Sequence, residues 1–335
     1  MGLRLWIRRR GAVSTAVLLV CSAGVGMCLL SVLYLSGALQ QGCDCSSFQS
    51  KRSESLKVAE GQHKLAVLVP LRDRFEELQD FVVHLSQFLE AQSVQHQIFA
   101  INQVDNLRFN RASLLNVGFL EAGEDFDYVA LHDVDLLPNT QDLTYFFPET
   151  GPFHLAAPHL HPRYHYPTFI GGVLLLTRKQ MIEVNGLSNV YWGWGLEDDE
   201  LFARLRDAHL VIHRPGNITA GLKSFRHMHD RRVRKRDQIR CFDQQLLTRR
   251  RDRRTGLSTV RYTLLERREL TVDGAAVSVL NVQLQCSRQQ TPWCDCVQNT
   301  GNSPKEKRRE IIHALPPEDV IAPKIDWKKH ISPDG

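Results

Sequence analysis

Short apolar runs alternate with longer helical segments between residues 65 and 131, and this order limits the possible folds more than any other feature of the sequence. Residues 65–69, 98–101 and 128–131 are apolar and predict buried strands. Residues 75–89 repeat apolar side chains at helical spacing, and residues 110–122 also predict a helix. A β-α-β-α-β order predicts an α/β fold with a parallel sheet of Rossmann type, whose ligands bind beyond the carboxyl ends of the strands.

The later part of the chain has less regular patterns. A strand is predicted at residues 169–177, a helix at 197–208 and a short strand at 210–212. After about residue 297 the chain is polar and interrupted by prolines, which predicts a disordered or loosely docked tail. A hydrophobic content of 43% and a charged content of 24% exclude disorder of the whole chain.

The N-terminal segment predicts a membrane anchor. No Asp, Glu, Lys or Arg occurs from Gly11 to Cys43, and four arginines precede this stretch. About 20 apolar residues span a bilayer, and flanking positive charge stays cytoplasmic, so the chain after the anchor is expected to be lumenal. A cleaved signal peptide is the alternative, but its apolar region is usually only about 7–15 residues long. We predict a cytoplasmic tail at 1–11, an anchor at 12–35, a stem at 36–63, a catalytic domain at 64–296 and a polar tail at 297–335.

A lumenal position has consequences for the cysteines and for the basic runs. The lumen is oxidising, so Cys286 and Cys294 are predicted to form a disulfide, with Cys296 as a competing partner. Basic runs at 231–236 and 249–254 would suit nucleic acid, which the lumen does not contain. We therefore expect no nucleic-acid partner.

Two carboxylates directly follow the third predicted strand, in the run from His132 to Asp135. At this edge of a parallel sheet they are placed to hold a divalent cation against a diphosphate, although such a pair also fits a solvated acidic turn. His227 and His229 are two positions apart, so an extended segment presents both imidazoles to one side. These residues predict a metal site of mixed oxygen and nitrogen ligands, which Mn²⁺ accepts.

Four consecutive carboxylates, from Glu197 to Glu200, begin a predicted helix directly after a Trp-Gly-Trp-Gly-Leu run. Acidic residues at a helix N-terminus are common because they interact favourably with the helix dipole. That preference does not explain the two tryptophans, whose faces suit sugar rings, or the two glycines, which let a loop move. A carboxylate here is expected to stay ionised and to act as a base toward a hydroxyl.

Together these segments resemble the β-1,4-galactosyltransferase family, inverting Golgi enzymes with a GT-A fold. The matching runs are residues 109–112, 115–119, 133–135, 171–172, 192–195 and 197–199. Residues 70–74, 154–166 and 225–230 are most similar to members that add galactose to xylose in the proteoglycan linker. The resemblance implies a GT-A catalytic domain that faces the Golgi lumen and is held in the membrane by a single type II signal anchor.

The resemblance also implies roles for individual residues. The implied Mn²⁺ ligands are Asp135, His227 and His229, and the implied base is Asp198. The implied contacts to UDP-galactose are Pro70, Arg72, Arg74, Phe109, Arg111, Asp133, Val134, Asp135, Trp194, His227, His229 and Arg236. The implied contacts to the acceptor are Tyr164, Tyr166, Trp194, Glu197, Asp198 and Asp199. The family usually has Tyr at the position of Phe169, so here the ring is kept and its hydroxyl is absent.

The implied activity is transfer of galactose from UDP-galactose to the 4-hydroxyl of O-linked β-xylose on proteoglycan core proteins. A transferase that acts on N-acetylglucosamine-terminated glycans is the alternative. A non-catalytic lectin with this fold would have lost the base or the metal ligands, and all of these residues are present.

Overall fold

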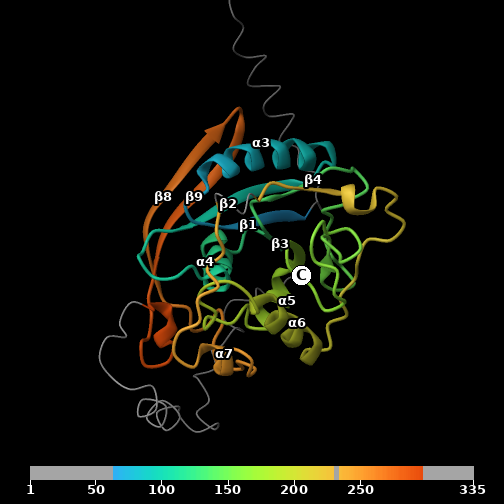
Figure 1. The fold of residues 1–335 in the computed structure, drawn as a ribbon. Helices are drawn as coiled ribbons and strands as arrows, with labels where there is room; N and C mark the ends of the chain where they lie inside the picture. The colour runs from blue at the N-terminus through green and yellow to red at the C-terminus, as the bar shows by residue number, and fades with distance from the viewer. Residues whose placement is uncertain (1–62, 230–233, 297–335) are drawn as a thin grey trace, which may run out of the picture. The chain divides into compact units, whose positions relative to one another are not determined.

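A seven-stranded sheet forms the centre of the described part of the chain, which comprises residues 63–229 and 234–296 of a computed structural model (Figure 1). The strand order is β5-β6-β3-β1-β2-β9-β8. The four central neighbours are parallel: β3 (Tyr128–His132), β1 (Lys64–Leu71), β2 (Gln95–Gln103) and β9 (Ala275–Leu284). The outer strands are antiparallel to their neighbours: β6 (Val173–Thr177), β5 (Phe153–His154) and β8 (Tyr262–Val272). The predicted parallel sheet is thus confirmed at its centre.

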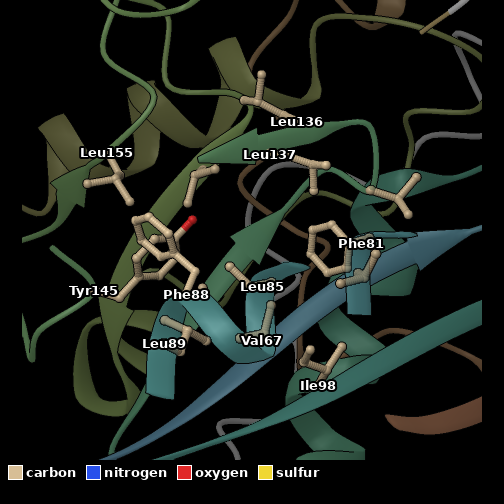
Figure 2. Packing of buried hydrophobic residues seen from close by; sticks show 14 of the residues in the cluster. Val67, Phe81, Leu85, Phe88, Leu89, Ile98, Leu136, Leu137, Tyr145 and Leu155 are labelled. Atoms are coloured by element: carbon tan, nitrogen blue, oxygen red, sulfur yellow. The ribbon is translucent and has the colours of Figure 1, made fainter. Parts of the chain in front are cut away.

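The alternation of side chains along β1 explains why helices cover both faces of the sheet. Leu65, Val67 and Val69 pack in one core cluster with α3 (Phe75–Ala91). Ala66 and Leu68 point the other way and pack with α4 (Arg111–Ala122). Figure 2 shows the first cluster, where Phe81 and Leu85 of α3 lie over Val67 and Ile98. Strand β1 is therefore buried on both sides, which accounts for its continuous apolar sequence.

Helix α4 lies very close to the sheet because it carries Gly118. A Cβ at this position would lie 2.7 Å from Ile101 Cδ1 and 3.3 Å from Leu68 Cδ2. The helix begins at Arg111 because Asn110 caps it: the Asn110 side chain accepts from the Ser113 N–H at 2.9 Å. The predicted helix is confirmed, and Asn110 is its cap rather than its first residue.

Two short strands, three helices and two 3₁₀ turns complete the described part of the fold. Strands β4 (Leu136–Pro138) and β7 (Phe225–His227) form a separate antiparallel pair. The short helices are α5 (Arg178–Glu183), α6 (Glu197–Asp207), α7 (Gln244–Leu247) and two 3₁₀ turns at Gly221–Lys223 and Pro292–Cys294. Helix α6 confirms the helix predicted at 197–208, with its last helical residue at Asp207.

Two strand predictions were wrong in part or in whole. The strand predicted from residue 169 begins only at Val173, because Gly172 has a φ of +79° that the ladder cannot accommodate. Residues 210–212 form no strand: Val211 is exposed, and only the neighbouring His213 makes an isolated bridge to Phe153. The hairpin β8–β9 was not predicted, although Asp273-Gly274 between two β-rich runs is a typical hairpin turn.

Two disulfides lie in the C-terminal part of the described region. Cys286 and Cys294 are bonded, which confirms the predicted pair. The prediction that Cys296 competes for either of them was wrong, because Cys296 is bonded to Cys241. The latter bond joins two segments that are 55 positions apart, a proximity that a turn-like local sequence does not indicate.

Within residues 63–229 and 234–296, no helix combines the length and the apolar character needed to cross a bilayer. The predicted cytoplasmic tail, anchor, all but the last residue of the stem, and the C-terminal tail lie outside the described residues.

Candidate active site

The predicted metal ligands meet where β3 ends. The β4–β7 ladder pairs Leu136 with His227, and the Met228 N–H donates to the Asp135 carbonyl at 2.8 Å, so the histidine segment runs beside Asp135. Asp135 Oδ2 lies 3.3 Å from His229 Nδ1 and 3.9 Å from His227 Nε2. The three side chains that the sequence singled out are therefore neighbours although 90 or so positions separate them.

Arg74 shares this carboxylate. Its Nη1 donates to Asp135 Oδ2 at 2.9 Å, and its Nη2 lies 3.3 Å from His229 Nδ1. Burial by itself raises the pKa of Asp135, but the hydrogen bond with His229 and the charge of Arg74 outweigh it, and the pKa lies well below its ordinary value. Asp135 is therefore ionised at neutral pH.

The residues fit a divalent transition metal by their chemistry. One carboxylate and two imidazoles suit Mn²⁺, and His229 Nε2 is buried without a hydrogen-bond partner. Within residues 63–229 and 234–296, however, no three His, Cys, Asp or Glu side chains are already drawn together as a finished metal site. Arg74 supplies the positive charge at Asp135 in this structure.

The carboxylates of α6 lie on the other side of Arg111. Arg111 donates to Asp133 Oδ1 through Nε at 2.8 Å, with Nη2 2.7 Å from the same oxygen, and its Nη1 lies 3.9 Å from Glu197 Oε1. Burial disfavours the charged guanidinium, yet Asp133 and Glu197 together raise the pKa of Arg111 above its ordinary value. Arg111 thus connects the edge of β3 with the first turn of α6.

Asp198 is partly buried beside the segment that precedes β6. A Cβ on Gly171 would lie 2.9 Å from Asp198 Oδ2 and 2.7 Å from the Phe169 ring, so only glycine lets these groups approach one another. Burial, reinforced by the charges of Glu197 and Asp199, raises the pKa of Asp198 to about 8. The expectation that a carboxylate here stays ionised was therefore wrong for Asp198, because burial outweighs the helix dipole.

Aromatic rings form a wall next to these carboxylates. The Phe169 ring centroid lies 5.1 Å from that of Tyr164 and 5.4 Å from that of Tyr166. Tyr166 hydrogen-bonds to Asp199, and the Tyr164 hydroxyl is buried without a partner. An unpartnered buried hydroxyl is ready to bind a polar group of a ligand.

Trp194 and Arg236 complete the wall. Arg236 Cζ lies 4.6 Å from the Trp194 ring centroid and 5.7 Å from that of Tyr164, a cation–π arrangement. Trp194 is 40% exposed and is thus accessible to a ligand. Arg236, expected to reach the diphosphate, lies among the expected acceptor residues in this structure.

Arg72, Pro70 and Val134 were also predicted to contact the donor, and each lies in a different environment. Arg72 donates to the carbonyls of Gln103 and Leu107 at 3.3 and 2.7 Å, so its guanidinium stabilises the turn between them. The same guanidinium lies over the Phe109 ring. Pro70 is buried within β1, and the Val134 side chain belongs to the core. Any contact of Val134 with a donor therefore involves its backbone.

One residue near the site escaped sequence analysis. His161 Nδ1 accepts from the backbone N–H groups of Arg163 and Tyr164, both at 3.0 Å, and its ring lies 6.3 Å from that of His227. Burial lowers the pKa of His161 to about 4, so it is neutral. His161 orients the Tyr164 segment, and its place in the sequence gave no periodic or spacing signal for this role.

Comparison with known proteins agrees with this arrangement. Residues 47–147 match the family model described as the N-terminal region of glycosyl transferase group 7, and residues 151–229 match the model described as the N-terminal domain of galactosyltransferase. Beta-1,4-galactosyltransferase 7 of Drosophila melanogaster is 54% identical over 70% of this chain and 73% of its own length. The xylosylprotein 4-beta-galactosyltransferase of Caenorhabditis elegans is 47% identical over 69% and 82%, respectively.

Solved structures agree as well. The catalytic domain of the Drosophila enzyme in complex with xylobiose has a TM-score of 0.69 and 54% identity, over 70% of this chain and 99% of that one. A mutant of the same enzyme, in complex with manganese, UDP-Gal and xylobiose, matches equally well. The fold and site define a GT-A-like transferase for nucleotide sugars. The chain belongs to the β-1,4-galactosyltransferase family.

Proposed function

We propose that this chain transfers galactose from UDP-galactose to the 4-hydroxyl of β-xylose on proteoglycan core proteins, the step that extends the glycosaminoglycan linker. The observation that carries the proposal is the position of Asp198. A carboxyl group with a pKa of about 8 lies between Arg111 on the donor side and the ring wall of Phe169, Tyr164 and Tyr166. A base with a pKa near neutrality is well matched to accepting a proton from a sugar hydroxyl.

The reaction is a single displacement. The acceptor O4 attacks the anomeric carbon of galactose, the bond from that carbon to the UDP oxygen breaks, and its electron pair leaves with UDP. Asp198 in its ionised form takes the proton from O4. Attack opposite the leaving group converts the α-linked donor into a β-linked product. The reaction needs one base and no covalent enzyme intermediate.

The arginines and the metal ligands are placed to stabilise the negative charge of the departing diphosphate. Arg74 and Arg111 lie at the edge where β3 ends, and their planar forks suit the diphosphate. Asp135, His227 and His229 would hold Mn²⁺, which when bound supplies positive charge against the departing diphosphate. Ionised Asp135 is ready for this ligation, because its pKa is low even without a metal.

The ring wall favours xylose over a larger acceptor. Xylose lacks the exocyclic hydroxymethyl group of hexoses, so a pocket for it is closed more tightly by aromatic rings. Tyr164, Tyr166 and Trp194 provide those rings, and the unpartnered Tyr164 hydroxyl provides a hydrogen bond. A larger sugar is then rejected by collision with the wall.

An acceptor comparison tests the proposal. The full chain, with UDP-galactose and Mn²⁺, should transfer galactose to a β-xyloside and leave N-acetylglucosamine nearly untouched at equal concentration. Comparable rates with the two acceptors would instead assign the chain to the alternative, a transferase for N-acetylglucosamine-terminated glycans.

We also propose a type II orientation in the Golgi membrane, with residues after the anchor in the lumen. Support comes from the uncharged stretch after four N-terminal arginines and from two disulfides, which require an oxidising compartment. Asn217, in the sequon Asn217-Ile218-Thr219, is exposed and offers a test. In cells, N-glycosidase treatment should reduce the mass of the full chain, and Asn217→Gln should remove that change. An untreated chain with the mass of the bare polypeptide would contradict a lumenal domain.

A further inference from the structure

Arg108 has a side chain that is only 9% exposed, and its hydrogen-bonding capacity is filled entirely by this chain. Nε and Nη2 donate to the two carboxylate oxygens of Asp237 at 2.6 and 2.9 Å. Nη1 donates to Gln244 Oε1 at 2.8 Å and to the Trp293 carbonyl at 3.1 Å. Nη2 also donates to the Ile239 carbonyl at 2.8 Å. All five guanidinium N–H groups are thus used, and none is left for a phosphate.

The residues around Arg108 also hold the loop that carries Trp194. The Trp194 N–H donates to the Asp237 carbonyl at 2.8 Å, and the Gly193 N–H donates to the Phe109 carbonyl at 2.8 Å. One residue earlier, the Trp192 carbonyl accepts from the Gln244 side-chain amide at 2.8 Å. Residues 192 and 194 are therefore hydrogen-bonded to Gln244 and Asp237, which also bind Arg108. Residue 193 is hydrogen-bonded to Phe109, the neighbour of Arg108 in the sequence.

Gly193 and Arg108 fit directly against each other. Gly193 has a φ of +84°, and a Cβ at this position would collide with Arg108 Nη2 and lie 2.8 Å from Arg108 Cζ. The guanidinium plane thus packs on the loop backbone itself, which fixes the loop from one side while Asp237 fixes it through a hydrogen bond.

We propose that Arg108 is a positioning residue for the acceptor: through Asp237 and Gly193 it holds the loop that presents the Trp194 ring. This inference rests on the proposed function, because that function makes Trp194 part of the acceptor site. The Trp194 side chain is 40% exposed, so the backbone contacts carry much of its positioning. Because every N–H group of this guanidinium already has a partner, the loop has few alternative arrangements. A pre-organised binding surface needs this restriction.

The test uses the conservative variants Arg108→Lys and Asp237→Asn in the full chain. Lysine keeps the charge but cannot fill a five-donor fork, and asparagine removes the charge from the bidentate pair. Each variant should raise KM for a β-xyloside about tenfold, as expected for loss of one charge-assisted hydrogen bond. KM for UDP-galactose should rise less than KM for the xyloside, because the expected donor contacts Arg74 and Arg111 pair with Asp135 and Asp133 and not with Arg108.

A double-mutant comparison separates positioning from general structural support. In a Trp194→Ala background, Arg108→Lys should have no further effect on KM for the xyloside, because the side chain through which it acts is gone. An equal effect in both backgrounds would overturn the proposal. So would a parallel rise in both Michaelis constants, or a lowered melting temperature with unchanged KM.

Arg204→Lys is the matched control. The Arg204 side chain is as buried as that of Arg108, at 9% exposure, and pairs with Glu200 at 2.8 Å. Its hydrogen bonds go to Glu200, to the carbonyls of residues 184–186 and to those of Asp252 and Thr255, so these bonds do not reach residues 192–194. Arg204→Lys should lower the melting temperature without raising KM for the xyloside relative to KM for the donor.

A readout without catalysis distinguishes failure of this inference from failure of the proposed function. The fluorescence of Trp194 is obtained as the difference between a chain with Trp194 and its Trp194→Phe counterpart. Acrylamide should quench this component more strongly in Arg108→Lys than in the unmodified chain. Equal quenching would overturn the positioning role, whereas an unmodified chain that transfers no galactose to xyloside would overturn the function alone.

Discussion

Arg74 Nη1 lies 2.9 Å from Asp135 Oδ2, so a cation of the protein neutralises the carboxylate expected to bind a metal ion. The same guanidinium lies 3.3 Å from His229 Nδ1. The hydrogen bond with His229 and the charge of Arg74 together hold the pKa of Asp135 well below its ordinary value. A metal ion held at Asp135 Oδ2 would share that oxygen with Arg74.

Metal dependence is the first expected outcome. EDTA should abolish galactose transfer by the full chain, and Mn²⁺ should restore it better than Mg²⁺, because imidazole ligands suit Mn²⁺ more than Mg²⁺. Initial rates measured after chelation and after addition of each metal check this. Full activity in EDTA would contradict the site formed by Asp135, His227 and His229.

Replacement of the base should separate chemistry from donor binding. Asp198→Asn keeps the shape of the side chain but cannot accept the proton, and the turnover rate should fall by about 10²–10⁴-fold. Binding of UDP in the presence of Mn²⁺, measured by calorimetry, should persist. A near-normal rate in this variant would transfer the role to Glu197 or Asp199.

The rate should also depend on pH through the same carboxyl group. Burial raises the pKa of Asp198 to about 8, so much of the free enzyme holds the group protonated at pH 7. Because the ionised form is the base, kcat/KM should rise as pH increases through about 8 and then level off. Profiles of kcat/KM from pH 6 to 9.5 test this sign. A rate that falls over this range would mean that Asp198 acts as an acid.

The ring wall should affect acceptor use selectively. Tyr164→Phe removes the unpartnered hydroxyl and Tyr164→Ala also removes the ring, so KM for a β-xyloside should rise in both and most in the alanine variant. Affinity for UDP should change little. Tyr262→Phe is the matched control, because Tyr262 lies on β8, at the opposite edge of the sheet from β5, and its hydroxyl bonds to Glu121 of α4. If Tyr164→Ala weakens UDP binding as much as xyloside use, the acceptor role is wrong.

The close approach of α4 to the sheet predicts a stability effect. Gly118→Ala places a Cβ 2.7 Å from the buried Ile101 side chain, and such overpacking typically costs about 1–3 kcal/mol in the free energy of unfolding. Gly216→Ala is the control, because no atom would lie within 4 Å of its Cβ. Thermal melts should show a lower midpoint for the first variant and a shift near zero for the second.

Local patterns predicted the elements around the site but not its electrostatics. Spacing and composition predict the strand that ends before Asp133 and the helix that begins at Glu197. They also predict the pair His227 and His229. The raised pKa of Asp198 does not, because it depends on burial against Phe169 and Gly171, which are distant in sequence. No local pattern distinguishes an arginine that braces a turn, as Arg72 does, from one that faces a ligand.

The sequence also did not predict which remote segments pair with each other. The spacing of Cys286 and Cys294 indicated a bond because the loop between them is short. Cys241 and Cys296 meet only through the packing of segments remote from each other. Likewise, the hairpin turn at Asp273-Gly274 reveals two strands, but it does not show that β9 pairs with β2.

The pairing of β2 with β9 places the last strand of the sheet against one of the first. Asn102 and Asn281, hydrogen-bonded across this pair at 2.9 Å, are 179 positions apart. During synthesis β2 therefore keeps an open hydrogen-bonding edge until almost the whole domain has emerged from the ribosome. A nonsense codon before Ala275 would leave that edge permanently exposed, and the truncated product would be a substrate for chaperones and quality control even though every expected catalytic residue had already been made.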